Sequence, residues 1–136
     1  MRTDTPRPIR LTDYAPPVFL IEEVALDFRL WTREAIVDIA GGIVNVIGAF
    51  LSLAAKYPDT ILPGYTHMQR AQPVLLAHHF LAYVEMLLRD LDRLREGYRR
   101  VNRSPLGAGA LAGVTYPVDP RYVADLLGFD GLCANS

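Results

Sequence analysis

Apolar residues recur at helical spacing over two long stretches of the chain. In the first, from about Asp27 to Tyr57, they step by three and four residues: Ile36, Ile39, Ile43, Val46, Phe50 and Leu53. This spacing predicts one long helix, which Pro58 ends. A second apolar set widens the stripe: Val37, Val44, Ile47 and Leu51. We therefore expect other helices to cover this one on more than one side.

The second stretch follows Pro73, a residue that suits a first helical turn. Its apolar residues keep a heptad spacing: Phe80, Val84, Leu87, Leu91, Leu94, Tyr98 and Val101. The positions between them are largely charged, with Glu85 and Arg89 in the favourable four-residue order. The pattern predicts a second long helix with one apolar seam and one solvated face.

The remaining segments are shorter and contain more turn residues. From Met1 to about Val24 the chain is rich in proline, which predicts an extended or irregular segment, with a short strand at Val18–Ile21 as an option. Asp59 to Pro73 is predicted to be a connecting loop, of a length that often carries function. A packed glycine-rich loop from Ser104 to Gly113 precedes a short helix that Asp119 caps and Gly128 ends. The predicted fold class is all-α.

Composition narrows the possible partners and compartments. The 136 residues suit one domain, and 14 Lys and Arg against 15 Asp and Glu give a net charge of -1. No overall field favours nucleic acid as a partner. Cys133, the only cysteine, has no partner for an internal disulfide, and the N-terminus lacks the apolar run of a secretory signal. Both features favour the cytoplasm.

The segment from Ala35 to Ala55 is nearly as long and apolar as a membrane span. Asp38 would be costly in hydrocarbon, and Gly41 and Gly42 weaken an isolated helix. A buried bundle helix is the favoured interpretation, and a membrane span is the alternative.

The predicted loop carries the residues with the most versatile chemistry. His67 supplies an imidazole, the side-chain group best suited to give or take a proton near neutral pH. Thr66, Gln69 and Gln72 can hydrogen-bond a carboxylate or an amide, and Arg70 adds positive charge. Residue types alone leave a structural role for His67 open, in which the imidazole bonds a carbonyl and stiffens the loop.

No metal or nucleotide site is expected from the other residues. His78 and His79 are adjacent, so on a helix they point about 100° apart and do not share one metal ion. The glycines near Gly107 lack the lysine of a phosphate-binding loop. We therefore expect neither a metal site nor a nucleotide site there.

Several segments follow one another in a distinctive order. They are LPGYTHMQRAQP at 62–73, then 79–90, NRSPLG at 102–107, TYP at 115–117, LGFDG at 127–131 and ANS at 134–136. From about Leu26 to Ser136 the chain thereby resembles argininosuccinate lyases of the fumarase/aspartase superfamily. Related lyases for fumarate, aspartate and adenylosuccinate have Gly-Arg before the threonine-histidine pair, where this chain has Gly64-Tyr65.

The resemblance implies a helical bundle that assembles as a cytoplasmic homotetramer. The implied reaction is a carbon–nitrogen elimination that releases arginine and fumarate from argininosuccinate, in arginine biosynthesis, without a cofactor. His67 matches the family's acid-base histidine, and Thr66 matches a threonine that contacts substrate. Gln69 is the further substrate-binding candidate.

Two departures limit the expected activity. The family's Ser-Arg-Asn-Asp motif should precede the first long helix, where this chain has Glu22-Glu23-Val24-Ala25. The mobile loop with the family's catalytic serine would follow Ser136. Because the family builds each site from three subunits, we expect a truncated chain with little or no lyase activity by itself.

The N-terminal segment has a weaker resemblance of its own. Met1 to about Leu30 resembles, through IRLTDYAPP at 9–17, the N-terminus of aminopeptidase N-type metallopeptidases, although the zinc-binding His-Glu-x-x-His is missing from the sequence. The expected organisation is a foreign segment at 1–25 and a partial lyase domain at 26–136. A non-catalytic helical assembly module and a small membrane-associated protein are the alternatives to a partial lyase.

Overall fold

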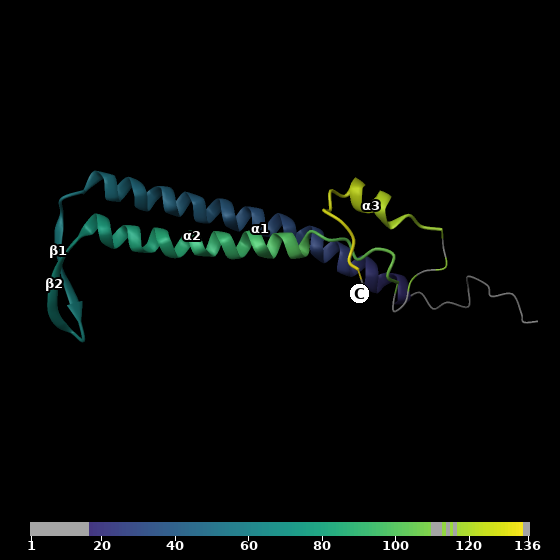
Figure 1. Cartoon of the computed structure of the whole chain (residues 1–136), viewed down its shortest axis with the longest axis horizontal. Helices are drawn as coiled ribbons and strands as arrows, with labels where there is room; N and C mark the ends of the chain where they lie inside the picture. The colour runs from purple at the N-terminus through teal and green to yellow at the C-terminus, as the bar shows by residue number, and fades with distance from the viewer. Residues whose placement is uncertain (1–16, 110–112, 114, 116, 135–136) are drawn as a thin grey trace, which may run out of the picture. The chain divides into compact units, whose positions relative to one another are not determined.

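A computed structural model describes residues 17–109, 113, 115 and 117–134, with side chains from residue 23 onward. Its elements are helix α1 (Pro17–Lys56), strands β1 (Ile61–Thr66) and β2 (Gln69–Leu75), helix α2 (Leu76–Val101) and helix α3 (Pro120–Leu126). Long helices dominate (Figure 1), which confirms the predicted helical fold class. Two compact units form, one from Thr32–Val101 and the other from the described residues up to Trp31 and from Asn102 onward.

Helix α1 begins earlier than the sequence pattern indicates. Its first residue is Pro17, so the prediction of extended chain is wrong for residues 17–24, and so is the optional strand at Val18–Ile21. A proline is well accommodated in a first turn, because its missing N–H would have no intrahelical acceptor there. The rest of the proline-rich segment lies outside the described residues.

Within the unit Thr32–Val101, α1 and α2 lie side by side (Figure 1). The α1 positions with the least exposure repeat at heptad spacing: Ile36, Ala40, Ile43, Ile47, Phe50 and Ala54. Three residues of the predicted stripe, Ile39, Val46 and Leu53, are instead exposed. Since α1 is apolar almost all round, the pattern alone did not identify the buried face, which includes two alanines that permit close approach.

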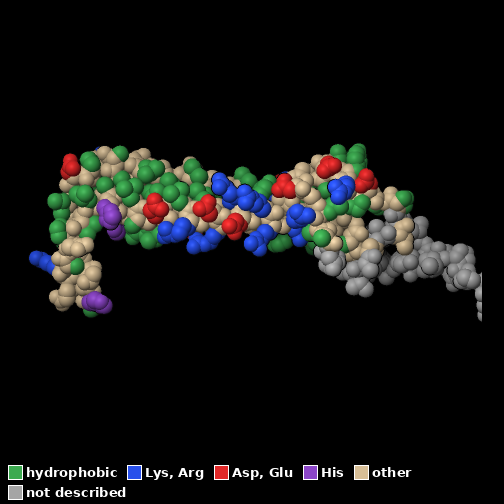
Figure 2. All heavy atoms as spheres, in the orientation of Figure 1, with side chains coloured by type: hydrophobic (Ala, Val, Ile, Leu, Met, Phe, Trp, Pro, Cys, Tyr) green, Lys and Arg blue, Asp and Glu red, His purple; other side chains and the backbone are tan. Residues whose placement is uncertain are grey.

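Helix α2 matches its prediction closely. Every residue of the predicted apolar seam is half-buried or buried, and Val84 is the most enclosed. The opposite face carries the ion pairs Arg93–Asp90 and Arg95–Asp92, both exposed. Figure 2 shows acidic and basic side chains gathered along this helix. The amphipathic pattern of α2 therefore identified its orientation correctly.

An aromatic cluster joins the two helices near the β-hairpin. The Phe50 ring of α1 has its centroid 5.7 Å from those of Phe80 and Tyr83 on α2. The Tyr83 ring also receives His79 in an edge contact at 5.2 Å. Aromatic pairs in these arrangements add stability beyond the area they bury.

The connection between the helices is a β-hairpin, so the predicted irregular loop at Asp59–Pro73 is wrong. β1 and β2 pair antiparallel, with Ile61 opposite Leu75 and Thr66 opposite Gln69. The register shifts between Pro63 and Tyr65, so Gly64 sits at a bulge. Prolines and glycine in this segment suggested a loop, but Pro63 and Pro73 face each other in a two-stranded ribbon, where the unpaired strand edges tolerate them.

The other unit contains α3 and the segments around it. Asp119 caps α3, as predicted: its Oδ1 accepts hydrogen bonds from the backbone N–H of Arg121 at 3.0 Å and of Tyr122 at 3.2 Å. Ser104 is fully buried, and its backbone pairs in parallel with the C-terminal segment, through Ser104 N to Gly131 O at 2.8 Å and Cys133 N to Ser104 O at 2.9 Å. The predicted packed loop after α2 is thus confirmed at its first residues.

Gly64→Ala is expected to destabilise the hairpin by roughly 1–3 kcal/mol. A Cβ at this position would lie 2.7 Å from the Gln72 backbone oxygen and 3.1 Å from Val74 Cγ2, and the backbone oxygen has little room to move. Faster amide hydrogen exchange in β1 and β2 would report the effect. Gly97→Ala is the matched control, because nothing lies within 4 Å of its Cβ; a gain of about 0.5–1 kcal/mol is expected in α2. Unchanged hairpin exchange in the Gly64 variant would contradict the role of the bulge.

The contact between Phe50 and Tyr83 is expected to couple the two helices energetically. In a double-mutant cycle of Phe50→Leu and Tyr83→Leu, followed by urea unfolding, we expect a coupling free energy of about 0.5–1.5 kcal/mol. The control cycle pairs Phe50→Leu with Tyr98→Leu, which lies about 22 Å further along α2 at 1.5 Å per residue. That pair should be additive, and additivity in both cycles would show that the ring contact does not join the helices.

Candidate functional site

The candidate site lies at the turn of the β-hairpin. β1 ends at Thr66 and β2 begins at Gln69, so His67 and Met68 alone form the turn. Both have positive φ, 50° for His67 and 61° for Met68. Positive φ at both central residues is the mark of a type I′ turn, whose twist matches that of the paired strands. The hairpin therefore presents the imidazole at its tip.

Strand pairing brings the two predicted substrate-binding residues together. Thr66 and Gln69 are direct partners across the ladder, next to the turn. Directly opposed residues of an antiparallel pair project from the same face of the ribbon. Tyr65 and Arg70 form the next pair and, by alternation, project from the other face. Thr66 and Gln69 thus share one face of the ribbon beside His67 in the turn, and these three polar residues are here called the tip strip.

All three residues of the tip strip are exposed. Among the described residues, the His67 side chain has no hydrogen bond, ion pair or ring contact. The structural alternative, in which the imidazole bonds a carbonyl to stiffen the loop, therefore finds no support there. Backbone pairing between the strands maintains the turn instead.

The chemistry available at the tip strip is proton transfer combined with hydrogen bonding. Imidazole can accept or donate a proton near neutral pH, while a threonine hydroxyl and a glutamine amide can orient a carboxylate or an amide. An efficient acid-base site also excludes water and stabilises developing charge. Within the described part of the chain, the exposed tip strip has no such enclosure, so it does not form a pocket by itself.

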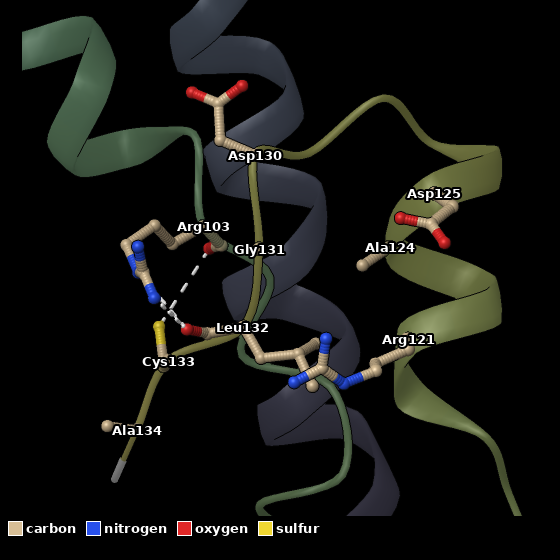
Figure 3. A pocket seen from close by; sticks show the side chains of 9 residues that line it. All are labelled: Arg103, Arg121, Ala124, Asp125, Asp130, Gly131, Leu132, Cys133 and Ala134. Atoms are coloured by element: carbon tan, nitrogen blue, oxygen red, sulfur yellow. Dashed lines mark hydrogen bonds between the residues drawn. The ribbon is translucent and has the colours of Figure 1, made fainter.

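A separate pocket lies in the unit that contains α3 (Figure 3). Its volume is about 420 Å³, and it is lined by two arginines, Arg103 and Arg121, two aspartates, Asp125 and Asp130, and the C-terminal segment. The Arg103 guanidinium donates to the Leu132 carbonyl from Nε at 3.1 Å and from Nη2 at 2.5 Å. That arginine therefore ties the loop after α2 to the C-terminal segment, which is a structural role.

The other histidines that the sequence offered, His78 and His79, lie on α2. His78 and His79 are both exposed, and the His79 ring contacts the rings of Phe80 and Tyr83. In the described ranges, no group of three or more His, Cys, Asp or Glu side chains is arranged to hold a metal ion.

Two features of the hairpin were not predicted from the sequence: the bulge at Gly64, and the place of Met68 beside His67 in the turn. Two strand-like runs separated by two residues would have indicated a hairpin, but Pro63 and Pro73 made both runs look like loop.

A family model described as "Lyase" matches residues 22–136. The chain belongs to this lyase family. The match begins slightly before the expected start near Leu26 and covers all the described elements from the first turns of α1 onward. It does not include IRLTDYAPP at 9–17, the motif that carries the resemblance to aminopeptidases, and residues 9–16 lie outside the described part of the chain.

Curated relatives confirm the resemblance to argininosuccinate lyases. The argininosuccinate lyase of Cupriavidus metallidurans is 56% identical over 115 residues, which are 85% of this chain and 24% of the relative. That of Burkholderia thailandensis is 58% identical over 116 residues, with the same two coverages. That of Oceanobacillus iheyensis is 52% identical over 115 residues. The lyase chain spans about a quarter of the length of these relatives, which are named for a small-molecule substrate.

Solved structures show the same helical architecture. An EDDS lyase, determined in complex with formate, is 37% identical, with a TM-score of 0.79; the match covers 82% of this chain and 22% of that one. A fumarate lyase from Brucella melitensis, described as a delta crystallin, is 21% identical, with a TM-score of 0.68 over 82% of this chain and 25% of that one. The second likeness supports the fold alone.

Proposed function

We propose that this chain is the segment of an argininosuccinate lyase that carries its threonine-histidine hairpin. The observation that supports the proposal most strongly is the tip strip, an exposed histidine flanked by a paired threonine and glutamine in a lyase-family chain. In the proposed reaction, a proton leaves the carbon next to a carboxylate, the carbon–nitrogen bond breaks, and fumarate and arginine separate. The electron pair of the broken C–H bond forms the double bond of fumarate, the pair of the carbon–nitrogen bond leaves on the arginine nitrogen, and that nitrogen takes up a proton. No net oxidation or reduction occurs, so the step requires no redox cofactor.

In this proposal His67 performs acid-base catalysis: its imidazole donates a proton to the departing guanidinium nitrogen. Thr66 and Gln69 contact the substrate from the face that they share. Proton transfer by a positioned side chain typically contributes 10²- to 10⁴-fold to the rate. Because the tip strip is exposed, the site needs walls from other segments, and the chain alone should have little or no activity.

The proposed assembly is a homotetramer of lyase subunits in the cytoplasm. Helix α1 exposes large apolar side chains on both sides of its least exposed face: Val37, Val44 and Leu51 on one side, and Ile39 and Val46 on the other. Contiguous exposed apolar surface is typical of an interface. Residues 26–136 are the proposed lyase segment and residues 1–25 a separate one; the family match begins at residue 22, within the last residues of the separate segment.

Two other functions have one supporting observation each. The exposed apolar side chains of α1 also suit a non-catalytic assembly module. The stretch Glu23–Lys56 is long and apolar enough, by length and composition, to cross a membrane. Core helices of soluble proteins have the same properties, and the lyase match includes this helix.

Restoration of a defective lyase tests the proposed function. The purified chain is mixed with an argininosuccinate lyase subunit that is defective only in its own threonine-histidine loop, and fumarate formation is measured. We expect restored activity that falls roughly 10²- to 10⁴-fold with His67→Asn, because asparagine removes the acid-base group yet tolerates positive φ.

His78→Asn is the matched control, since His78 is an exposed histidine on α2 outside the hairpin. It should restore as much activity as the unmodified chain. Restoration that survives His67→Asn, or no restoration at all, would exclude the catalytic role and favour the assembly module.

The membrane alternative has its own test. We expect the chain, mixed with the loop-defective lyase subunit, to stay in the supernatant when it is centrifuged with lipid vesicles, because other helices of the lyase assembly are proposed to cover α1. Vesicles with and without anionic lipid separate apolar insertion from charge attraction. Co-sedimentation that persists at high salt would contradict the soluble lyase assignment.

A further inference from the structure

Met68 is an unusually exposed apolar residue in an unfavourable backbone conformation. Its side chain is 94% exposed, the largest value among the large hydrophobic residues that the structure describes. Its φ of 61° lies in the left-handed region. Neither property stabilises this chain by itself. The exposed thioether gains no hydrophobic burial, and the left-handed backbone conformation disfavours a side chain at this position.

A type I′ turn favours glycine, asparagine or aspartate at both central positions. Here both positions hold larger side chains, and local conflicts of this kind tend to mark functional sites. The proposed acid-base role accounts for His67. Another requirement must account for Met68, since glycine would suit its backbone better.

The surroundings of Met68 indicate what kind of surface it contacts. Its neighbours at the tip are polar: Thr66, His67, Gln69 and Arg70. Argininosuccinate offers carboxylates and a guanidinium group, to which a thioether contributes little. A flexible, unbranched side chain is instead suited to filling an irregular apolar gap on another protein surface.

We propose that Met68 is a positioning residue that inserts among apolar side chains of the lyase subunit that completes the site. This inference rests on the proposed function and adds a specific anchor to it. Insertion of Met68 holds the tip of the hairpin against that subunit, so that His67, its neighbour in the turn, reaches the substrate. Met68 itself touches no reacting atom.

The anchor and a purely structural role predict opposite effects for one substitution. Met68→Gly and Met68→Asn should preserve or improve the turn, because both residues accept positive φ. Slower or unchanged amide exchange in β1 and β2 would confirm that the hairpin is intact. If Met68 is an anchor, the same variants should weaken association with the completing subunit, whereas Met68→Leu should retain it.

The experiment uses the full chain and the loop-defective argininosuccinate lyase subunit described above. Binding is measured by analytical ultracentrifugation, and fumarate formation is measured as the chain is titrated. We expect Met68→Gly and Met68→Asn to raise the chain concentration for half-maximal binding and restoration by roughly 10- to 100-fold, the equivalent of losing one buried methionine side chain. Met68→Leu should lie close to the unmodified chain, and the KM for argininosuccinate at saturating chain should not change.

Three results would have distinct meanings. Binding by the glycine and asparagine variants that equals that of the unmodified chain would overturn the anchor, whatever the activity. A raised KM with unchanged binding would also overturn it, because Met68 would then contact substrate. If the unmodified chain binds through Met68 but restores no activity, the anchor stands and the proposed lyase function fails.

Discussion

The apolar seam between α1 and α2 is the constraint on which the candidate site depends. A two-stranded hairpin is marginally stable by itself and needs a hydrophobic partner. Here the hairpin continues directly into α2, whose apolar seam packs along α1. Near the hairpin, the Phe80 and Tyr83 rings of α2 contact the Phe50 ring of α1. The helices therefore hold both ends of the ribbon, and its tip, where every residue from Tyr65 to Arg70 is exposed, is free to meet other molecules.

The register of the ribbon then determines which side chains meet at the tip. Gly64 permits close approach to the Gln72 carbonyl, and the bulge there changes the pairing from Pro63–Pro73 to Tyr65–Arg70. A shift of one residue would move every side chain to the opposite face. The bulge is thus what makes Thr66 and Gln69 partners and leaves His67 and Met68 as the turn.

Helix α1 carries more apolar surface than this chain covers. Ile39, Val46 and Leu53 satisfy the helical period but stay exposed, while Ala40 and Ala54 are enclosed. A helix that is apolar on most sides is typically buried among several others. The chain spans about a quarter of its curated relatives, and the same incompleteness recurs at the exposed tip strip.

The sequence by itself determined the helical class, the α2 seam, the Asp119 cap and the lyase family, because each depends on local spacing or on contiguous motifs. It also singled out Thr66, His67 and Gln69. Only the tertiary structure decided which face of α1 is buried, that residues 61–75 form a hairpin, and that Met68 shares the turn with His67. Those features depend on strand register and helix contact, which join residues far apart in the sequence and leave no local periodicity.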